Sequence, residues 1–164
     1  MSNQQTVSCA IALGSNLGES QQNLEQAISQ LNQLPEITVN EVSSWYETVP
    51  VGPAQPNYLN GCALVATSLA PHPLLDTLLR IETQFGRVRQ KRWGARTLDL
   101  DLLLYEDVVL DTPRLKLPHP RMRERAFVLV PLGEIAPNWV DPVTGSAIAQ
   151  LKDTIDYSGI LQQL

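Results

Sequence analysis

Two stripes of apolar residues at three- and four-residue spacings place the strongest limit on how this chain can fold. One stripe runs through residues 24–34 and the other through residues 71–81, and each predicts a helix with one apolar face. The segments 7–13, 36–46 and 58–69 are apolar runs or alternate with polar residues, as strands do. The chain is therefore predicted to form a sheet on which both helices pack.

A fourth strand, residues 97–105, completes the order β-α-β-β-α-β and is expected at the centre of the sheet. This order is typical of the α+β class with a ferredoxin-like βαββαβ core, in which helices pack on an antiparallel sheet. After it we expect a short strand at 108–110, a proline-rich loop at 114–121 and a last helix around 123–135.

The size of the chain predicts one domain. It has 164 residues, of which 43% are hydrophobic, and this is enough for a core of its own. We expect residues 1–164 to form a single domain, with the tail after about residue 138 at its periphery.

The charge balance excludes a general nucleic-acid partner. The net charge is -5 and the sequence pI is near 4.9, whereas nucleic-acid affinity depends on Lys and Arg that neutralise phosphates. The polar N-terminus and the short apolar run after it predict neither a signal peptide nor a membrane span, so we expect a soluble, cytoplasmic protein. Cys9 and Cys62 lie in separate apolar stretches and are predicted to be buried free thiols.

Asp99 and Asp101 are the first candidates for chemistry. Two residues apart on a strand, their carboxylates point to the same face about 7 Å apart, while the leucines beside them point into the core. Mg²⁺ is usually held by one or two carboxylates, with waters and phosphates as the other ligands. The alternative is an acidic strand face exposed to solvent.

The ten residues before this strand contain five cations in an otherwise acidic protein: Arg87, Arg89, Lys91, Arg92 and Arg96. Guanidinium groups bind phosphate oxygens in pairs, so cations beside a metal-binding pair favour polyphosphate transfer. The alternative is a solvated basic loop that pairs with the two aspartates.

Two further segments are less informative from their residues alone. His119 lies between prolines and near several arginines, which makes it a second candidate phosphate contact. The segment Gly14 to Gly18 lacks the spacing of a phosphate-binding loop and is predicted to be a tight turn followed by a helix N-cap.

The run from Gly86 to Asp101 closely resembles the signature of the 6-hydroxymethyl-7,8-dihydropterin pyrophosphokinase family of folate biosynthesis. Its most specific part is Arg-Trp-Gly-Ala-Arg-Thr-Leu-Asp-Leu-Asp. Four other segments are similar to blocks of that family in the same order, so that the resemblance covers roughly residues 7–138. They are Ala12 to Leu17, Ser44 to Thr48, Gln55 to Asn60 and Leu117 to Met122.

The resemblance implies transfer of the β,γ-diphosphate of ATP to the hydroxymethyl oxygen of the pterin, with AMP as the other product and two Mg²⁺ ions as cofactors. Asp99 and Asp101 would bind the metals and, with Arg87 and Arg96, act in catalysis. Further nucleotide contacts would come from Glu82, Arg89, Arg92, Trp93, Arg114, His119 and Arg125. The pterin would be held by Thr48, Val51, Tyr58, Asn60 and Phe127, with Tyr58 and Phe127 on the two faces of its ring.

The chain departs from the family pattern at Val49 and Gln90. These departures bear on the dynamics of the loops and the rate more than on the type of reaction. Two other functions stay open. A two-metal nucleotidyltransferase would also use paired carboxylates, but it would release pyrophosphate in place of AMP. A ferredoxin-like binding module for RNA or a regulatory ligand is disfavoured by the acidic balance. We expect ATP and the pterin as the only partners of a monomer.

Overall fold

The computed structural model describes residues 5–50, 55–86 and 97–164. Its strands are β1 (Val7–Ser15), β2 (Ile37–Val42), β3 (Tyr46–Thr48), β4 (Tyr58–Thr67), β5 (Asp99–Tyr105), β6 (Leu110–Asp111), β7 (Lys116–Leu117) and β8 (Ile160–Gln163). Its helices are α1 (Ser20–Gln33), α2 (Pro71–Gln84), α3 (Ala126–Ile135) and α4 (Ile148–Lys152), with a 3-10 turn, η1 (Met122–Glu124), before α3.

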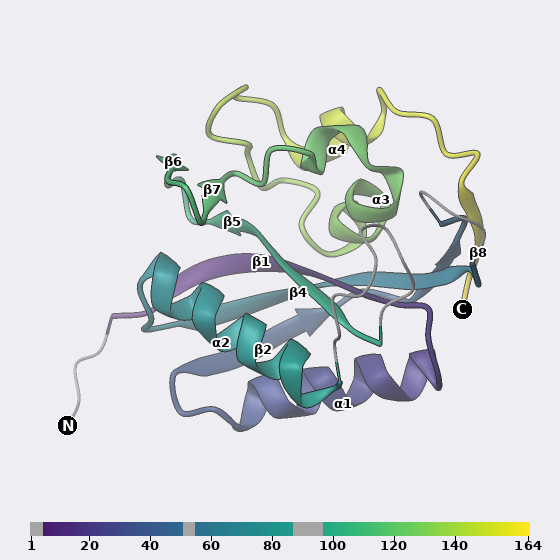
Figure 1. Cartoon of the computed structure of the whole chain (residues 1–164). Coiled ribbons are helices and arrows are strands. Elements are labelled where there is room, and N and C mark those ends of the chain that lie inside the picture. Colours follow the sequence, from purple (N-terminus) through teal and green to yellow (C-terminus); the bar gives the residue numbers. More distant parts are fainter. Residues whose placement is uncertain (1–4, 51–54, 87–96) are drawn as a thin grey trace.

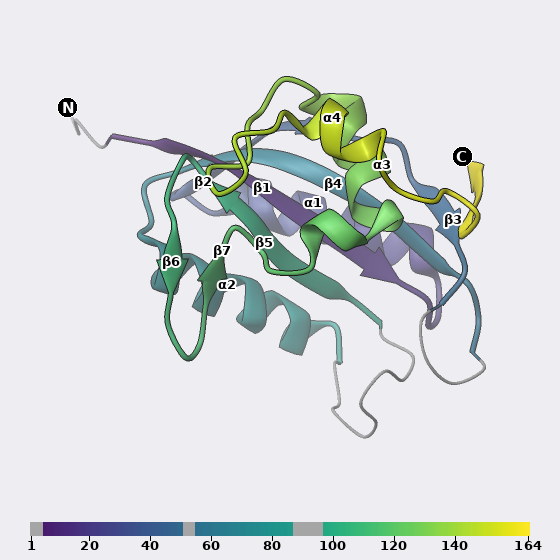
Figure 2. The ribbon, with the colours of Figure 1, turned by 90° about the horizontal axis from the view of Figure 1, so that it is seen from above.

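The main sheet is antiparallel throughout. Its strands follow the order β5-β1-β4-β3-β8, and β2 also pairs with β4 (Figure 2). Short strands β6 and β7 form a separate hairpin. The order of elements from β1 to β5 confirms the predicted α+β, βαββαβ core.

The predicted central position of the strand with the two aspartates is wrong. β5 is at one end of the strand order and pairs with β1. One edge of β4 is occupied by β1 over nine register pairs and the other by β2 and β3. β5 therefore lies along the outer edge of β1, the edge that β4 does not occupy.

The strand predicted at 36–46 is divided into β2 and β3. Val42 pairs with Ala63 but Tyr46 pairs with Asn60, so one extra residue is accommodated between them, as in a bulge. The ring of Trp45 lies against Gly61, where an added Cβ would come within 2.4 Å of the ring. The bulge separates β3 from β2 and lets Thr48 reach the other end of β4.

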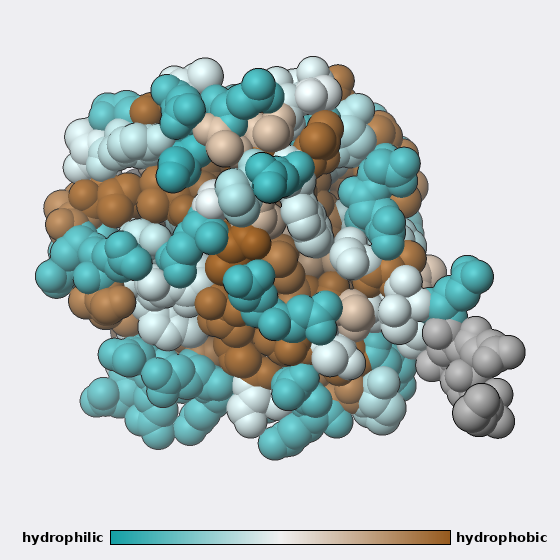
Figure 3. Space-filling model, turned by 180° about the vertical axis from the view of Figure 1, so that it is seen from behind, coloured by the Kyte–Doolittle hydropathy of each residue, from teal (hydrophilic) through white to brown (hydrophobic). Residues whose placement is uncertain are grey.

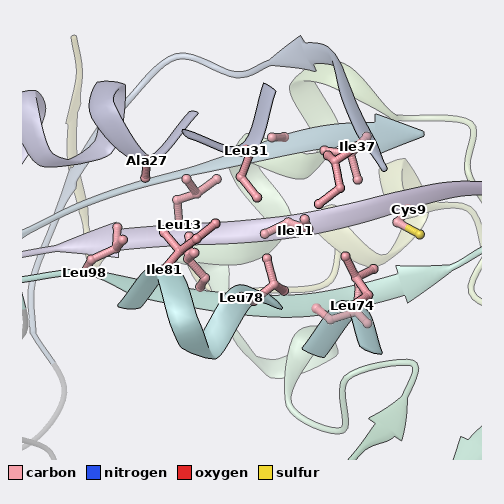
Figure 4. Packing of buried hydrophobic residues seen from close by; sticks show 14 of the residues in the cluster. Cys9, Ile11, Leu13, Ala27, Leu31, Ile37, Leu74, Leu78, Ile81 and Leu98 are labelled. Carbon is pink, nitrogen blue, oxygen red and sulfur yellow. The ribbon is translucent and has the colours of Figure 1, made fainter. Parts of the chain in front are cut away.

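Helices cover both faces of the sheet (Figure 1). On one face, side chains of α1 and α2 meet those of β1 in the larger core cluster (Figure 4). The labelled members with no exposed surface are Cys9, Ile11, Ala27, Leu31, Leu74, Leu78 and Leu98. A second cluster, which contains Leu129 and Leu132 of α3 and Ile148 of α4, fills the other face. The sheet is therefore the middle of three layers.

The residues beyond Asn138 contribute to the sheet. α4 packs beside α3, and β8 pairs with β3. This final strand was not predicted, because a stretch of four residues that contains two glutamines has no clear strand pattern.

The surface carries apolar as well as hydrophilic side chains. In the view from behind, apolar side chains gather near the centre of the face, with hydrophilic ones around them (Figure 3). Among the described helices, none has both the length and the apolar content needed to cross a membrane.

Candidate active site

A cavity of about 610 Å³ lies between the sheet and α3. Its floor comes from β1, β4 and β5, and its opposite wall comes from the loop before η1 and the first turn of α3. The cavity is lined by eight residues that were predicted as site residues: Thr48, Tyr58, Asn60, Asp99, Asp101, His119, Arg125 and Phe127. Residues far apart in the chain are thus brought to one place.

The two aspartates lie on the cavity face of β5, as strand alternation predicts. Asp99 is opposite Gly14 and Asp101 is opposite Ala12 on β1. Leu100 is 3% exposed and belongs to the core on the other side of the sheet. The core therefore fixes the strand, while both carboxylates face the cavity.

Asn60 lies across β1 from Asp99. Gly14 is in register with Asn60 on one side and with Asp99 on the other. The Asn60 side chain is buried, and its Nδ2 donates a 2.6 Å hydrogen bond to Oγ1 of the buried Thr48. A Cβ on residue 14 would lie 2.7 Å from Asn60 Oδ1, so the amide fits only because residue 14 is glycine.

The segment that begins at Gly14 differs from its prediction. Gly14 and Ser15 belong to β1, and the tight turn comes later, at Gly18, whose φ is +75°. No side chain caps the start of α1 in the described structure, so the predicted N-cap is wrong. Asn16 instead donates through Nδ2 to Pro56 O at 2.9 Å. This bond holds the approach to β4, where Tyr58 lies.

Two aromatic residues come from opposite walls of the cavity. Tyr58 begins β4 in the floor, and Phe127 is in the first turn of α3. The guanidinium carbon of Arg125 lies 5.4 Å from the centre of the Phe127 ring, within the range of a cation–π contact. The cavity wall therefore includes two aromatic rings.

His119 is held by the backbone on both sides. Its N–H donates to Leu103 O on β5 at 2.9 Å, and its Nδ1 accepts from the Arg121 N–H at 3.2 Å. Burial lowers the pKa of His119 below 6.5, Asp101 opposes that shift, and Arg125 and Arg121 add to it. A neutral ring whose Nδ1 accepts carries its proton on Nε2, where it can be donated to an anion.

Two predicted nucleotide contacts lie away from the cavity. Glu82 is on α2, on the other face of the sheet, and its carboxylate accepts from the Leu100 N–H. Arg114 forms a salt bridge with Asp76 of α2. The remaining predicted site residues lie outside the described part of the chain: Val51, Arg87, Arg89, Arg92, Trp93 and Arg96.

The C-terminal segment also lines the cavity, which the sequence did not reveal. Asp156, Gly159 and Ile160 are part of its wall. The Val49 N–H donates to Gly159 O at 2.9 Å, which joins this segment to the end of β3. Glu124 and Arg121 line the cavity as well, and the only sequence signal for them was their proximity to His119.

The cysteines are buried free thiols, as predicted. Burial raises the pKa of Cys9 to about 12 and raises that of Cys62 as well. Neither thiol is a source of thiolate at neutral pH, so neither is a candidate nucleophile.

The comparison with known proteins agrees with this geometry. A model of the family described as 7,8-dihydro-6-hydroxymethylpterin-pyrophosphokinase matches residues 10–137. The chain belongs to this family. The matched range contains the βαββαβ core apart from the first three residues of β1, and it contains all the predicted site residues, so the resemblance seen in the sequence is confirmed.

Curated members of the family match over almost the whole chain. The 2-amino-4-hydroxy-6-hydroxymethyldihydropteridine pyrophosphokinase of a Synechocystis species is 49% identical over 157 residues, which are 96% of this chain and 80% of the relative. The Pseudomonas aeruginosa protein of the same name is 47% identical over 151 residues, 92% of this chain and 93% of the relative.

A solved structure supports the fold independently. The chain aligns with Plasmodium falciparum HPPK-DHPS, crystallised with pteroate, with a TM-score of 0.75 at 14% identity. The alignment covers 93% of this chain and 43% of the Plasmodium chain, so this chain spans less than half of that protein.

Proposed function

We propose that the cavity under α3 is the place where this chain transfers the β,γ-diphosphate of ATP to the hydroxymethyl oxygen of 6-hydroxymethyl-7,8-dihydropterin. Pyrophosphoryl transfer from ATP to this pterin, in folate biosynthesis, is the activity of the family to which the chain belongs. One observation supports this location. The same cavity is lined by the carboxylates of Asp99 and Asp101 and, on the other side of Gly14, by Asn60. Tyr58 and Phe127 also line the cavity, and we call the part formed by Tyr58, Asn60 and Phe127 the aromatic end.

We assign the pterin to the aromatic end. A flat ring is bound well between Tyr58 and Phe127, which approach from opposite walls. The amide of Asn60 would pair with the edge of the pterin that carries its own amide and amino groups. Since Thr48 accepts from Nδ2, it fixes the orientation of that amide. Thr48 and Val51 would add backbone contacts.

The carboxylate pair fits magnesium. Asp99 and Asp101 offer the hard oxygen ligands that Mg²⁺ prefers. In the described chain, no group of three His, Cys, Asp or Glu side chains forms a closed metal site, so this pair would leave positions for waters and phosphate oxygens. When bound, two Mg²⁺ ions would neutralise charge on the triphosphate.

We assign the triphosphate to the same end of the cavity as the aspartates. His119, Arg121 and Arg125 line this region and can donate to phosphate oxygens. We propose that Arg87, Arg89, Arg92, Trp93 and Arg96, which precede β5 in the chain, complete the nucleotide site. A nucleotide contact by Arg114 stays a prediction, since it would require an exchange with Asp76.

The reaction needs little covalent help from the protein. The substrate hydroxyl attacks the β-phosphorus and releases its proton to water, a new oxygen–phosphorus bond forms, and the bond from the β-phosphorus to the α–β bridging oxygen breaks so that AMP leaves. In-line transfer of this kind is accelerated mainly by alignment and charge stabilisation. The strands that hold Asn60 and Asp99 on either side of Gly14 would provide that alignment.

Identification of the adenine product tests the proposal. The protein is incubated with MgATP and hydroxymethyldihydropterin, and nucleotides are separated by chromatography. Formation of AMP with pterin diphosphate is expected, and both should disappear in Asp101→Asn. Release of pyrophosphate would instead indicate nucleotidyl transfer and overturn the assignment.

We also propose that the chain acts as a monomer in the cytoplasm. Sedimentation velocity at enzyme concentrations that support full turnover should give a particle near 18.2 kDa. A stable dimer under those conditions would contradict the monomer.

A further inference from the structure

Glu82 is an acid on the apolar side of α2. It is four residues after Leu78 and therefore lies on the same helix face, toward the sheet. Only 2% of its surface is exposed. A buried carboxylate is costly unless hydrogen bonds stabilise it, so its position requires an explanation.

The carboxylate holds the strand that carries the two aspartates. Glu82 Oε2 accepts a 2.7 Å hydrogen bond from the backbone N–H of Leu100, the residue between Asp99 and Asp101. A hydrogen bond to a charged acceptor is among the stronger ones in proteins. Glu82 therefore acts on the peptide unit that joins the two candidate metal ligands.

This strand needs such support because of its place in the sheet. β5 is at the end of the described strand order and has β1 on one side. Along its outer side, Glu82 accepts from Leu100 N–H, and Leu103 O accepts from His119 N–H. A side chain and a loop thus supply bonds at the outer edge of β5, one at the metal end and one beside the histidine.

We infer that Glu82 is a positioning residue for Asp99 and Asp101, which acts through Leu100 and not through contact with the nucleotide. The inference rests on the proposed function, because the two aspartates are taken as metal ligands there. It differs from the role implied by the family resemblance, which places Glu82 near ATP. Its burial and its absence from the cavity wall support the indirect role.

Three variants distinguish this positioning role from direct contact with the nucleotide. Glu82→Gln keeps an acceptor oxygen at the same reach, Glu82→Asp keeps the charge but shortens the side chain by one methylene, and Glu82→Ala removes both. Thr77→Ala is the matched control. Thr77 is also a buried polar residue of α2, but its hydroxyl donates to Pro73 O and accepts from Arg80, so both of these hydrogen bonds lie within the helix.

The measurements are turnover, the MgCl2 concentration for half-maximal turnover at saturating substrates, and pterin affinity. Loss of a partner that orients a metal ligand costs about 10- to 100-fold in metal affinity or activity. We expect that loss in Glu82→Ala and Glu82→Asp, with a higher MgCl2 requirement, whereas Glu82→Gln stays within about threefold of wild type because it can still accept. Pterin affinity should change by less than about twofold, since Glu82 is outside the pterin end of the cavity.

Two results would overturn the inference. One is an unchanged MgCl2 requirement in Glu82→Asp. The other is a loss confined to the KM for ATP, with full turnover at saturating ATP, which indicates direct nucleotide contact. If Glu82→Ala does not fold, the comparison of Gln with Asp still decides the question. If wild type forms no AMP, the proposed function fails separately, and titration with Mn²⁺ alone then tests whether the Asp variant weakens metal binding and the Gln variant does not.

Discussion

Replacement of Gly14 by alanine is expected to weaken pterin binding, although residue 14 offers the ligand no side chain. The added Cβ would lie 2.7 Å from Asn60 Oδ1, so the oxygen has to move by about 0.3 Å to reach 3.0 Å and by about 0.7 Å to reach an ordinary contact of 3.4 Å. Asn60 is tied to Thr48 by a 2.6 Å bond between two buried side chains. The movement therefore breaks or bends that bond.

The magnitude follows from these contacts. A buried polar group that loses its partner costs about 1–3 kcal/mol. The lower backbone freedom of alanine in the unfolded chain offsets this by at most about 1 kcal/mol. We expect a net loss between about 0 and about 3 kcal/mol in the free energy of unfolding. The dissociation constant for the pterin should rise about 10- to 100-fold, since each 1.4 kcal/mol is a factor of ten.

Isothermal titration with the pterin and, separately, with MgATP measures the effect, and urea unfolding measures stability. MgATP affinity should stay close to wild type. Gly61→Ala is the control, because its new Cβ would strike Trp45 on the opposite face of the sheet. It should destabilise the protein without a comparable loss of pterin affinity. Wild-type pterin affinity in Gly14→Ala would refute the reasoning, as would equal losses in both variants.

Three further predictions concern the cavity itself. Asp101→Asn should abolish turnover while urea unfolding shows an intact fold, since the carboxylate faces the cavity and not the core; near wild-type turnover at normal Mg²⁺ would exclude it as a ligand. Tyr58→Ala and Phe127→Ala should each weaken pterin binding by about 1 kcal/mol or more, with little change for ATP; equal losses for both ligands in titrations would mark them as packing residues. In the metal-free protein, stability contributed by neutral His119 is present above pH 6.5 and is lost as pH falls from there through its lowered pKa. His119→Gln should flatten the dependence of the free energy of unfolding on pH in this range, and an unchanged dependence would contradict the prediction.

Local periodicity was enough to predict the core elements and the direction of the two aspartates. The stripes of α1 and α2 and the alternation around Asp99 are properties of short segments, and burial of their leucines preserves them in the fold. The position of β5 depends on which edges are already occupied, and no single segment contains that information. The predicted central strand was wrong for this reason.

Residue type and spacing alone indicated Asp99, Asp101 and His119, whereas Thr48, Tyr58, Asn60 and Phe127 were predicted only through the family resemblance. The role of Gly14 depends on its neighbours across two strands, and that of Gly159 depends on the pairing of β8 with β3. Arg114 is near His119 in sequence, yet the β6–β7 hairpin takes it to Asp76 on α2. Glu82 did carry a signal that was available early, because a carboxylate four residues after Leu78 falls within an apolar stripe.

The register of Gly14 with Asn60 and Asp99 also sets a length. Neighbouring strands lie about 4.8 Å apart, so the backbones that carry these two side chains are separated by about 10 Å across β1. Backbone hydrogen bonds fix this separation, and loop movements do not change it. With the pterin and the metal bound as proposed, we expect this length to select reactants by their combined reach: a pterin with a longer hydroxyalkyl arm would place its oxygen past the phosphorus, and one with a shorter arm would stop before it.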